Sequence, residues 1–274
     1  MLRSNIAALS AAVLLAGCST APTTAPADIP EVRPGTGVLS GYLKPAQLPD
    51  SLALLPPPPA EGSAAMAADQ AAFEASRAAP NVDRWGLAAR DSDLKFPQAA
   101  STFACALDLP IGETTTPHVN MLLRRTLADA GLSTYRAKDH YQRQRPFVKN
   151  RVGTCAPQDE ASLAKDGSYP SGHSATGWAW ALVLTQVAPD RADRLLARGH
   201  AFGQSRVVCG AHWQSDVEAG RVIGAAAFAR LQSDPVFLAQ LEAARAEVVK
   251  ARAAGMSVPS AECSAESAAL KAAR

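Results

Sequence analysis

The sequence predicts an all-α protein, folded as a single-domain helical bundle. Apolar and small residues recur at helical spacing along most of the chain, and no stretch alternates polar and apolar residues for long enough to predict a strand. Proline and glycine residues divide the chain into segments of helical length. Helices of this kind bury their apolar faces by packing against one another, and this predicts a bundle.

The first predicted helices begin at cap and turn signals. Ser63 can cap a helix that runs to about residue 78, and a second helix is expected over 97–107. Pro117 begins a third helix, because proline is favoured in the first helical turn. A helix from about Ser133 to Arg145 should follow, and it should stop there because Pro146 cannot continue it.

The second half of the chain is predicted to contain a loop and four longer helices. Residues 147–169 include two glycines and a proline and show no clear period, so most of this segment is expected to be loop. Breaks at Pro189-Asp190 and Ser233-Asp234-Pro235 divide the segment that follows. The expected helices are 172–187, 190–208, 213–232 and 234–253.

Residues 1–17 have the features of an export signal. Arg3 provides a charged start, and the apolar stretch that follows is too short to span a bilayer. The sequence Leu15-Ala16-Gly17-Cys18 looks like a bacterial lipoprotein processing box, in which Cys18 becomes the lipidated first residue. An ordinary cleaved signal with an incidental cysteine is the alternative. We therefore expect a periplasmic protein that is anchored to a membrane by lipid on Cys18.

The remaining chain is predicted to divide into three parts. Residues 18–60 are rich in Pro, Thr and Ala and are expected to form a tether. Residues 61–256 are expected to form the folded domain, and 257–274 an Ala-, Ser- and Glu-rich C-terminal tail. No segment of the domain reaches the length of a membrane helix, so the lipid is the only membrane contact expected.

Charge and cysteine content exclude two kinds of site. The net charge is +2, so no basic excess indicates a nucleic-acid partner. Apart from Cys18 there are four cysteines, whose spacing does not match a zinc site. An even number in an exported protein suggests disulfides, although four reduced core cysteines remain the alternative. Of the three pairings, the preferred one joins Cys155 to Cys209 and Cys105 to Cys263.

The first candidate motif contains Lys138 and Arg145, which are seven residues apart. On one helix this spacing is two turns, so both side chains would leave from one stripe, with Arg143 off it. Such a stripe is usually a solvated face. Here Pro146 would end the helix and free the guanidinium of Arg145 to enter a cleft, where its planar fork suits two phosphate oxygens and Lys138 adds a point charge.

The second motif is Pro170-Ser171-Gly172-His173, where a loop becomes a helix. A helix N-terminus presents unpaired N–H groups to an anion, and Gly172 lets the anion approach closely. The Ser171 hydroxyl can donate as well, and His173 would stand beside the anion. A capping serine followed by a surface histidine is the alternative.

The third motif is Ser205-Arg206 followed by His212 and Asp216. His212 and Asp216 are one helical turn apart, so the carboxylate can accept from one ring nitrogen, fix the tautomer and leave the other nitrogen free. A plain surface contact is the alternative.

Together the three motifs supply cations for a phosphate, a neutral imidazole to attack and a second imidazolium to protonate the leaving oxygen.

These segments match the three-part signature of the type-2 phosphatidic acid phosphatase and vanadium haloperoxidase superfamily, which the chain resembles at every signature position. Other stretches, from about residue 50 to about 250, resemble the class A bacterial non-specific acid phosphatases. They include Leu55-Pro56-Pro57-Pro58-Pro59, Gly167-Ser168-Tyr169, Gly203-Gln204-Ser205-Arg206 and His212-Trp213-Gln214-Ser215-Asp216.

The resemblance implies a helical bundle of this superfamily's type and a broad-specificity acid phosphatase. His212 would attack phosphorus, Asp216 would orient it, and protonated His173 would donate to the leaving oxygen, which predicts activity below neutral pH. The resemblance further implies small phosphomonoester substrates, no metal or cofactor, and a homodimer. The phosphate would be held by Lys138, Arg145, Ser171, the Gly172 N–H and Arg206.

Two other functions would use the same residues. A vanadate-dependent haloperoxidase would hold vanadate in place of phosphate, and it would oxidise bromide with peroxide. A phosphate-binding lipoprotein without catalysis would need the cations but neither histidine. The presence of His173, His212 and Asp216 favours the phosphatase over this binding module.

Overall fold

The computed structural model describes residues 22–78 and 81–271, and within these ranges it contains helices and no strand. The described backbone has an isolated bridge between Glu31 and Leu39. The predicted all-α class is therefore confirmed. The predicted export signal and the lipidation site at Cys18 lie outside the described residues.

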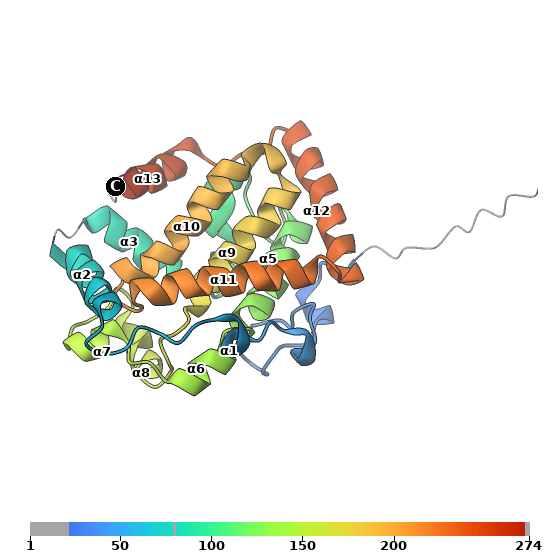
Figure 1. Ribbon diagram of the computed structural model, residues 1–274. Helices are drawn as coiled ribbons and strands as arrows, with labels where there is room; N and C mark the ends of the chain where they lie inside the picture. The colour runs from blue at the N-terminus through green and yellow to red at the C-terminus, as the bar shows by residue number, and fades with distance from the viewer. Residues whose placement is uncertain (1–21, 79–80, 272–274) are drawn as a thin grey trace, which may run out of the picture.

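Helix α9 (Gly172–Val187) lies at the centre of the bundle (Figure 1). It packs against α5 (Pro117–Leu132), α10 (Ala192–Val208) and α11 (Gln214–Leu231), and α12 (Pro235–Ala253) covers α5 and α9. The four helices predicted between residues 172 and 253 are therefore present with nearly the predicted bounds.

Aromatic rings fill the core around α9. Trp180 and Phe202 are fully buried, and their ring centroids are 6.0 Å apart. Phe103 meets Trp180 edge-on at 6.2 Å, an arrangement worth about 0.5–1.5 kcal/mol beyond the buried area. The buried indole nitrogen of Trp180 donates to the carbonyl oxygen of Leu123 at 2.9 Å, so its polar atom is satisfied.

The start of α9 is held close to α11. A Cβ atom added to Gly220 of α11 would lie 2.5 Å from the carbonyl oxygen of Ser171, and only a residue without a side chain allows this approach. The amide of Ser171 also donates to the carbonyl of Asp216 at 2.9 Å. The second and third motifs are thereby locked together through the backbone.

Shorter helices surround the bundle. The remaining α-helices are α1 (Ser51–Leu54), α2 (Ala64–Ala78), α3 (Val82–Asp91), α4 (Ala104–Leu107), α6 (Tyr135–Tyr141), α7 (Pro146–Asn150), α8 (Glu160–Leu163) and α13 (Ser260–Lys271). The 3-10 turns are Pro26–Asp28, Pro45–Gln47, Gln98–Phe103, Pro157–Asp159 and Pro189–Arg191.

The single helix predicted over 133–145 is wrong. Helix α6 ends at Tyr141, Gln142 has a positive φ of 44°, and Arg145 is extended. Pro146 begins α7 instead of ending a helix, because its fixed φ suits a first turn and its ring keeps the preceding residue out of the helical region. Lys138 and Arg145 therefore come from two different elements.

Two further differences concern the segment before α5. The helix predicted over 97–107 is a 3-10 helix, Gln98–Phe103, followed by the short α4. Helix α3 was not predicted from the sequence. The side chain of Asn81 caps it by accepting from the amide of Arg84 at 2.7 Å.

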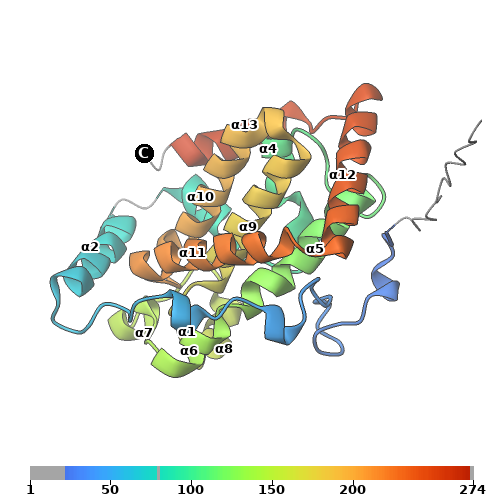
Figure 2. The same ribbon diagram turned by 45° about the vertical axis from the view of Figure 1, so that its right-hand side comes forward.

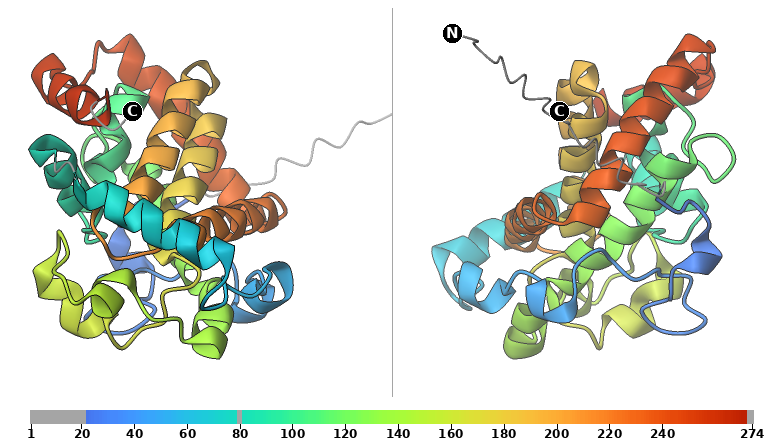
Figure 3. Two further views of the ribbon diagram at one scale, coloured as in Figure 1. Left: turned by 60° about the vertical axis from the view of Figure 1, so that its left-hand side comes forward. Right: turned by 90° about the vertical axis from the view of Figure 1, so that its right-hand side faces the viewer.

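The predicted tether, residues 18–60, is wrong for its second half. Tyr42 and Leu43 are buried in the main core, and their amides donate to the buried carboxylate of Asp129 at 3.0 and 2.9 Å. Arg125 lies over the Tyr42 ring at 3.9 Å and donates to the carbonyl of Gly41. These partners on α5 are remote in sequence, so composition could not reveal them. Figure 3 shows this segment, in blue, on the same side as α6 in green.

The C-terminal segment is also attached to the domain. The predicted tail, 257–274, contains α13, which packs near α3 and α4 (Figure 2). Cys263 of α13 forms a disulfide with Cys105, and Glu266 pairs with Arg198 at 3.2 Å. With the second disulfide, Cys155–Cys209, the preferred pairing is confirmed.

Among the described residues, no helix combines the length and the apolar character needed to cross a membrane.

Candidate active site

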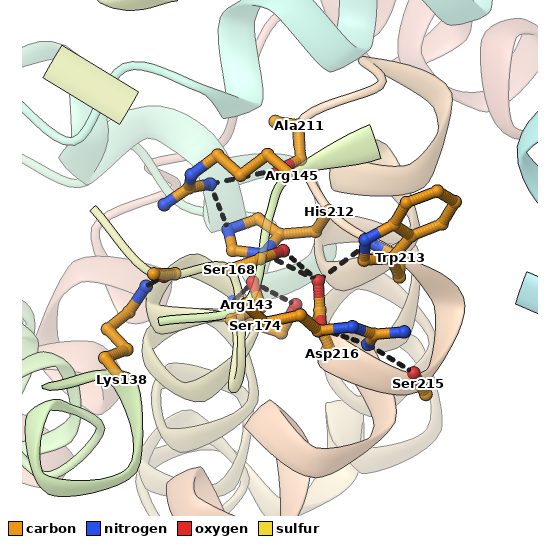
Figure 4. A network of polar contacts seen from close by, with 12 residues as sticks. Lys138, Arg143, Arg145, Ser168, Ser174, Ala211, His212, Trp213, Ser215 and Asp216 are labelled. Atoms are coloured by element: carbon orange, nitrogen blue, oxygen red, sulfur yellow. Dashed lines mark hydrogen bonds and ion pairs between the residues drawn. The ribbon is translucent and has the colours of Figure 1, made fainter. Parts of the chain in front are cut away.

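The three motifs meet at the start of α9, where His212 is held on both ring nitrogens (Figure 4). Its Nδ1 lies 3.4 Å from Oδ2 of Asp216, and its Nε2 lies 3.0 Å from Nη1 of Arg145. Because the guanidinium can only donate, Nε2 accepts, and Nδ1 carries the proton toward Asp216. The Nε2 lone pair therefore faces the cations.

Asp216 is completely buried and accepts several hydrogen bonds besides that of His212. The amide of Trp213 donates to Oδ2 at 2.8 Å, and the hydroxyl of Ser168 donates to the same oxygen. These donors satisfy the carboxylate away from water and fix its direction toward the imidazole. The predicted His212–Asp216 pair is thus a buried contact and not a surface one.

Arg143 is the neighbour of Asp216 that sequence reasoning missed. Its Nη1 donates to Oδ1 of Asp216 at 2.6 Å, and its Nη2 donates to Oδ2 of Asp69 at 2.7 Å. Asp69 in turn accepts from the amide and hydroxyl of Ser215. A single helix over 133–145 predicts that Arg143 lies off the stripe of Lys138 and Arg145. The extended backbone after Gln142 points it at Asp216 instead.

Lys138 and Arg145 converge despite lying on separate elements. Nζ of Lys138 and Nη2 of Arg145 lie 3.0 and 2.9 Å from one oxygen, Oδ2 of Asp166. Both cations are nearly buried, with relative exposures of 3% and 2%. Burial and the neighbouring Arg145 lower the pKa of Lys138 to about 8, while Asp166 acts in the opposite direction.

The N-terminus of α9 carries Ser171, Gly172 and His173. The Ser171 oxygen caps the helix by accepting from the amide of Ser174 at 3.2 Å, and it also accepts from the Ser174 hydroxyl at 2.9 Å. Its own proton remains available to an anion. Ser171 can therefore cap the helix and still donate a hydrogen bond to an anion, so the two alternatives raised from the sequence do not exclude each other.

His173 lies in the first turn of this helix, and one of its ring nitrogens has a hydrogen-bond partner in the protein. Its Nε2 is 3.0 Å from the carbonyl oxygen of Ser92, so Nε2 donates and Nδ1 is the nitrogen left for the site. The ring also stacks on Phe202 with centroids 6.5 Å apart. Burial, followed by the nearby Arg206, lowers the pKa of His173 well below its usual value.

Arg206 is buried, with a relative exposure of 1%. Within the described part of the chain, its Nε and Nη1 atoms have no hydrogen-bond partner. Burial and the charge of Arg145 lower its pKa to about 10, which leaves it charged at neutral pH. Since an unpaired buried guanidinium is costly, its free donors suit an anion that enters the site.

The turn from Arg206 to His212 is braced by a disulfide. The carbonyl of Arg206 accepts from the amides of Ala211 and His212 at 3.0 and 3.3 Å, and Gly210 has a φ of +79°. Cys209 in this turn is bonded to Cys155, whose amide also donates to the Cys209 carbonyl at 3.2 Å. These constraints set the position of His212 relative to Arg206.

Electrostatics keep His212 neutral. Burial lowers its pKa well below the usual histidine value, and Arg145, Lys138 and Arg206 lower it further. A neutral imidazole, with its lone pair on Nε2, is the form that can attack an electrophile. The cations that suppress its protonation are the same groups that would draw a phosphate toward it.

Two cavities meet at His173. A cavity of about 340 Å³ is lined by Lys138, Arg145 and His212 together with Gly172 and His173. A wider cavity of about 820 Å³ is lined by His173 and Arg206, and it opens toward other side chains that include Arg90, Lys95, Phe96 and Arg124. Six of the eight predicted site residues line these cavities, and the buried Ser171 and Asp216 lie directly behind them, so a cation-lined cavity lies beside a larger space.

No group of three or more His, Cys, Asp or Glu side chains with the geometry of a metal site occurs among the described residues.

Comparison with known proteins shows the family of this chain. Residues 119–235 match the family model described as the PAP2 superfamily. Over 210 residues the chain is 48% identical to the non-specific acid phosphatase of Providencia stuartii, covering 76% of this chain and 85% of that relative. It is 44% identical over 208 residues to the non-specific acid phosphatase of Salmonella typhi, covering 76% and 83% of the two chains.

A third relative is more distant but matches over a similar length. The acid phosphatase of Zymomonas mobilis is 41% identical over 203 residues, which cover 74% of this chain and 77% of that protein. Identity at this level across most of both chains means a common fold. The chain belongs to the PAP2 superfamily and, within it, to the class A non-specific acid phosphatases.

Proposed function

We propose that this protein is an exported acid phosphatase that hydrolyses phosphate monoesters of many kinds through a phosphohistidine intermediate and without a metal. The enzyme class, phosphoric monoester hydrolase, follows from its family. The observation that carries the mechanism is the position of His212. Its ring is fixed between Asp216 and Arg145, with a neutral Nε2 turned toward buried cations.

The first step transfers the phosphoryl group to the enzyme. The lone pair on Nε2 of His212 attacks phosphorus, a P–N bond forms, and the P–O bond to the leaving group breaks. His173 gives a proton to the leaving oxygen, which departs as an alcohol. Asp216 stabilises the positive charge that develops on the His212 ring, since Nδ1–H already points to it.

The second step regenerates the enzyme. His173, now neutral, takes a proton from a water molecule whose oxygen attacks phosphorus. The P–N bond breaks, its electron pair returns to Nε2 of His212, and inorganic phosphate is released. Lys138, Arg145, Arg206, Ser171 and the Gly172 N–H hold the non-bridging oxygens in both steps, so catalysis depends on placement and charge.

Acid activity is consistent with the two histidines. Because the pKa of His212 is well below its usual value, acid solution does not readily remove the nucleophile. A bound dianion would offset Arg206 and Arg145, which together with burial lower the pKa of His173, and so would help His173 hold a proton. Both effects favour turnover below neutral pH.

Broad specificity is supported by the wide cavity next to the anion pocket. At about 820 Å³ it is large enough for many leaving groups. Its lining combines the apolar Leu94, Phe96 and Leu127 with polar residues, so no single leaving-group chemistry is selected by the described side chains. We also propose export to the periplasm and lipid anchoring at Cys18, on the sequence features of residues 1–18.

Trapping with an aryl phosphate and a denaturing alkaline quench tests this mechanism. Wild type should yield a phosphoenzyme that is labile in acid and stable in base, whereas His212→Ala should yield none and lose turnover while still binding inorganic phosphate. Turnover in the wild type should persist in excess chelator. Normal turnover by His212→Ala would overturn the covalent histidine, and loss of activity in chelator would overturn metal independence.

A further inference from the structure

Asp166 occupies a position within the cation cluster that none of the three motifs includes. A single atom, its Oδ2, accepts from Nζ of Lys138 at 3.0 Å and from Nη2 of Arg145 at 2.9 Å. An oxygen with partial negative charge between two buried cations has the contacts expected for a phosphate oxygen bound there. The Asp166 carboxylate therefore lies where the proposed function requires substrate.

We propose that Asp166 is an internal stand-in for phosphate: its carboxylate neutralises Lys138 and Arg145 between turnovers and leaves the pocket when a phosphate monoester binds. This inference rests on the proposed function, because it takes these two cations as the phosphate site. Asp166 thereby competes with substrate and with the product phosphate for the same donors.

The need for a stand-in follows from burial. Lys138 and Arg145 lie close together with little access to water. Burial lowers the pKa of both side chains, and the charge of Arg145 lowers the pKa of Lys138 further. An unpaired pair of buried cations would be costly or would lose a proton. Asp166 supplies the missing negative charge and so keeps the anion pocket charged and assembled.

The Asp166 side chain is free to leave, because its backbone is held and its carboxylate is not enclosed. The side chain is 33% exposed, in contrast to the 4% and 2% of Lys138 and Arg145. The Asp166 carbonyl accepts from Nε of Arg145 at 3.0 Å, and the amide of Ser168 donates to the carbonyl of Arg143 at 2.8 Å. A rotation of the side chain alone would move the carboxylate toward solvent.

The neighbouring glycine keeps this backbone in place. A Cβ atom on Gly167 would lie 2.6 Å from the carbonyl oxygen of Lys138, so the backbone after Asp166 packs directly against α6. The carbonyl of Gly167 also accepts from Nζ of Lys138. Lys138 therefore keeps one partner when the carboxylate leaves, and its ammonium stays aimed at the pocket.

Charge decides the exchange. A phosphate monoester dianion brings two negative charges and several acceptor oxygens, whereas Asp166 brings one charge and one bridging oxygen. The dianion can also use the unpaired donors of Arg206, which Asp166 does not contact. Substrate therefore displaces the carboxylate, but part of its binding free energy is used to do so.

The test compares Asp166→Asn and Asp166→Ala with a matched control, Asp139→Asn. Asp139 is an exposed acid on α6, next to Lys138 in sequence, and makes no side-chain contact with the two cations among the described residues. The probe is inorganic phosphate, titrated at pH 6 by calorimetry and as a competitive inhibitor of aryl phosphate hydrolysis.

Removing the competing carboxylate should tighten phosphate binding about three- to tenfold in both Asp166 variants. The control should stay within about twofold of wild type. Phosphate should also raise the melting temperature more in Asp166→Asn than in wild type, because the variant lacks its internal anion.

Weaker phosphate binding in both Asp166 variants would overturn the proposal, since it would mean that Asp166 only positions the cations. Unchanged binding would overturn it as well, and so would a phosphate complex in which Asp166 still bridges Lys138 and Arg145. Failure of the proposed function is a separate result: the wild type itself would then show no phosphatase activity.

Discussion

Two buried arginine–carboxylate clusters in this bundle are built from nearly the same parts. In the first, which we name the Asp216 cluster, Asp216 accepts from Arg143 and from the hydroxyl of Ser168. In the second, the Asp91 cluster, Asp91 accepts from both Nη atoms of Arg198 at 3.1 and 2.5 Å and from the hydroxyl of Ser205.

The clusters differ in a further side chain that each one includes. Asp216 faces the ring of His212, whereas the Asp91 cluster adds Arg84, whose Nη1 donates to Ser205 at 2.9 Å. The first cluster therefore ends in a group that can react, and the second only ties α3 and α13 to α10. Similar buried arginine–carboxylate pairs thus hold the proposed nucleophile in one place and a helix contact in the other.

The largest expected effect is that of Asp216→Asn on turnover. The amide would no longer fix the Nδ1–H tautomer of His212 or stabilise its charge, so kcat should fall about 10³- to 10⁴-fold. Steady-state kinetics on the folded variant measures this. A kcat within about tenfold of wild type would remove the distinction between the two clusters.

Asp91→Asn should act on stability instead. It breaks the bidentate pair with buried Arg198, and the free energy of unfolding should fall by about 3 kcal/mol, near the low end of the range for such pairs because Glu266 still contacts the guanidinium. Denaturant titration measures the loss. Turnover at a temperature where the variant is folded should change by less than about tenfold.

A matched pair of arginine changes sharpens the contrast. Arg143→Lys keeps a charge but cannot hold Asp216 and Asp69 at once, so Asp216 should lose its orientation and kcat should fall about 10- to 100-fold. Arg198→Lys breaks a similar fork in the Asp91 cluster. It should lower the melting temperature and leave kcat of the folded protein nearly unchanged. Similar kcat losses in Arg143→Lys and Arg198→Lys would contradict a catalytic role for the Asp216 cluster alone.

The smallest expected effect is a change of KM with pH. It concerns Lys138, which lies on the His212 side and has no counterpart in the Asp91 cluster. The pKa of Lys138 is lowered to about 8, so raising the pH through 8 removes a charge from the phosphate site. KM for an aryl phosphate should then rise, by up to about tenfold per pH unit, while it stays flat from pH 6 to 7. Lys138→Arg should shift the rise to higher pH. A KM profile that is flat to pH 10 would contradict a role for this charge.

Sequence reasoning predicted site residues that the structure brings together, but it missed some of the residues that surround them. His212 and Asp216 share one turn of local spacing, and Ser171 to His173 are contiguous, so short-range patterns were sufficient. The helix over 133–145 was wrong because a proline after a basic run was taken as a stop signal, whereas Pro146 begins α7. That error also concealed Arg143, whose partners Asp69 and Asp216 are 74 and 73 residues away.

The amino-acid sequence by itself determined the helical class and supplied the three motifs from which the candidate reacting groups were predicted. It left three cysteine pairings open, and the structure contains the preferred one. The helical class and each separate motif depend on residue type and on spacing within a few turns of chain. Only the tertiary structure decided that residues 39–55 are part of the domain, that Arg143 supports Asp216, and that Asp166 lies between Lys138 and Arg145. Such contacts depend on which distant side chains are buried together, and local propensity carries no information about that choice.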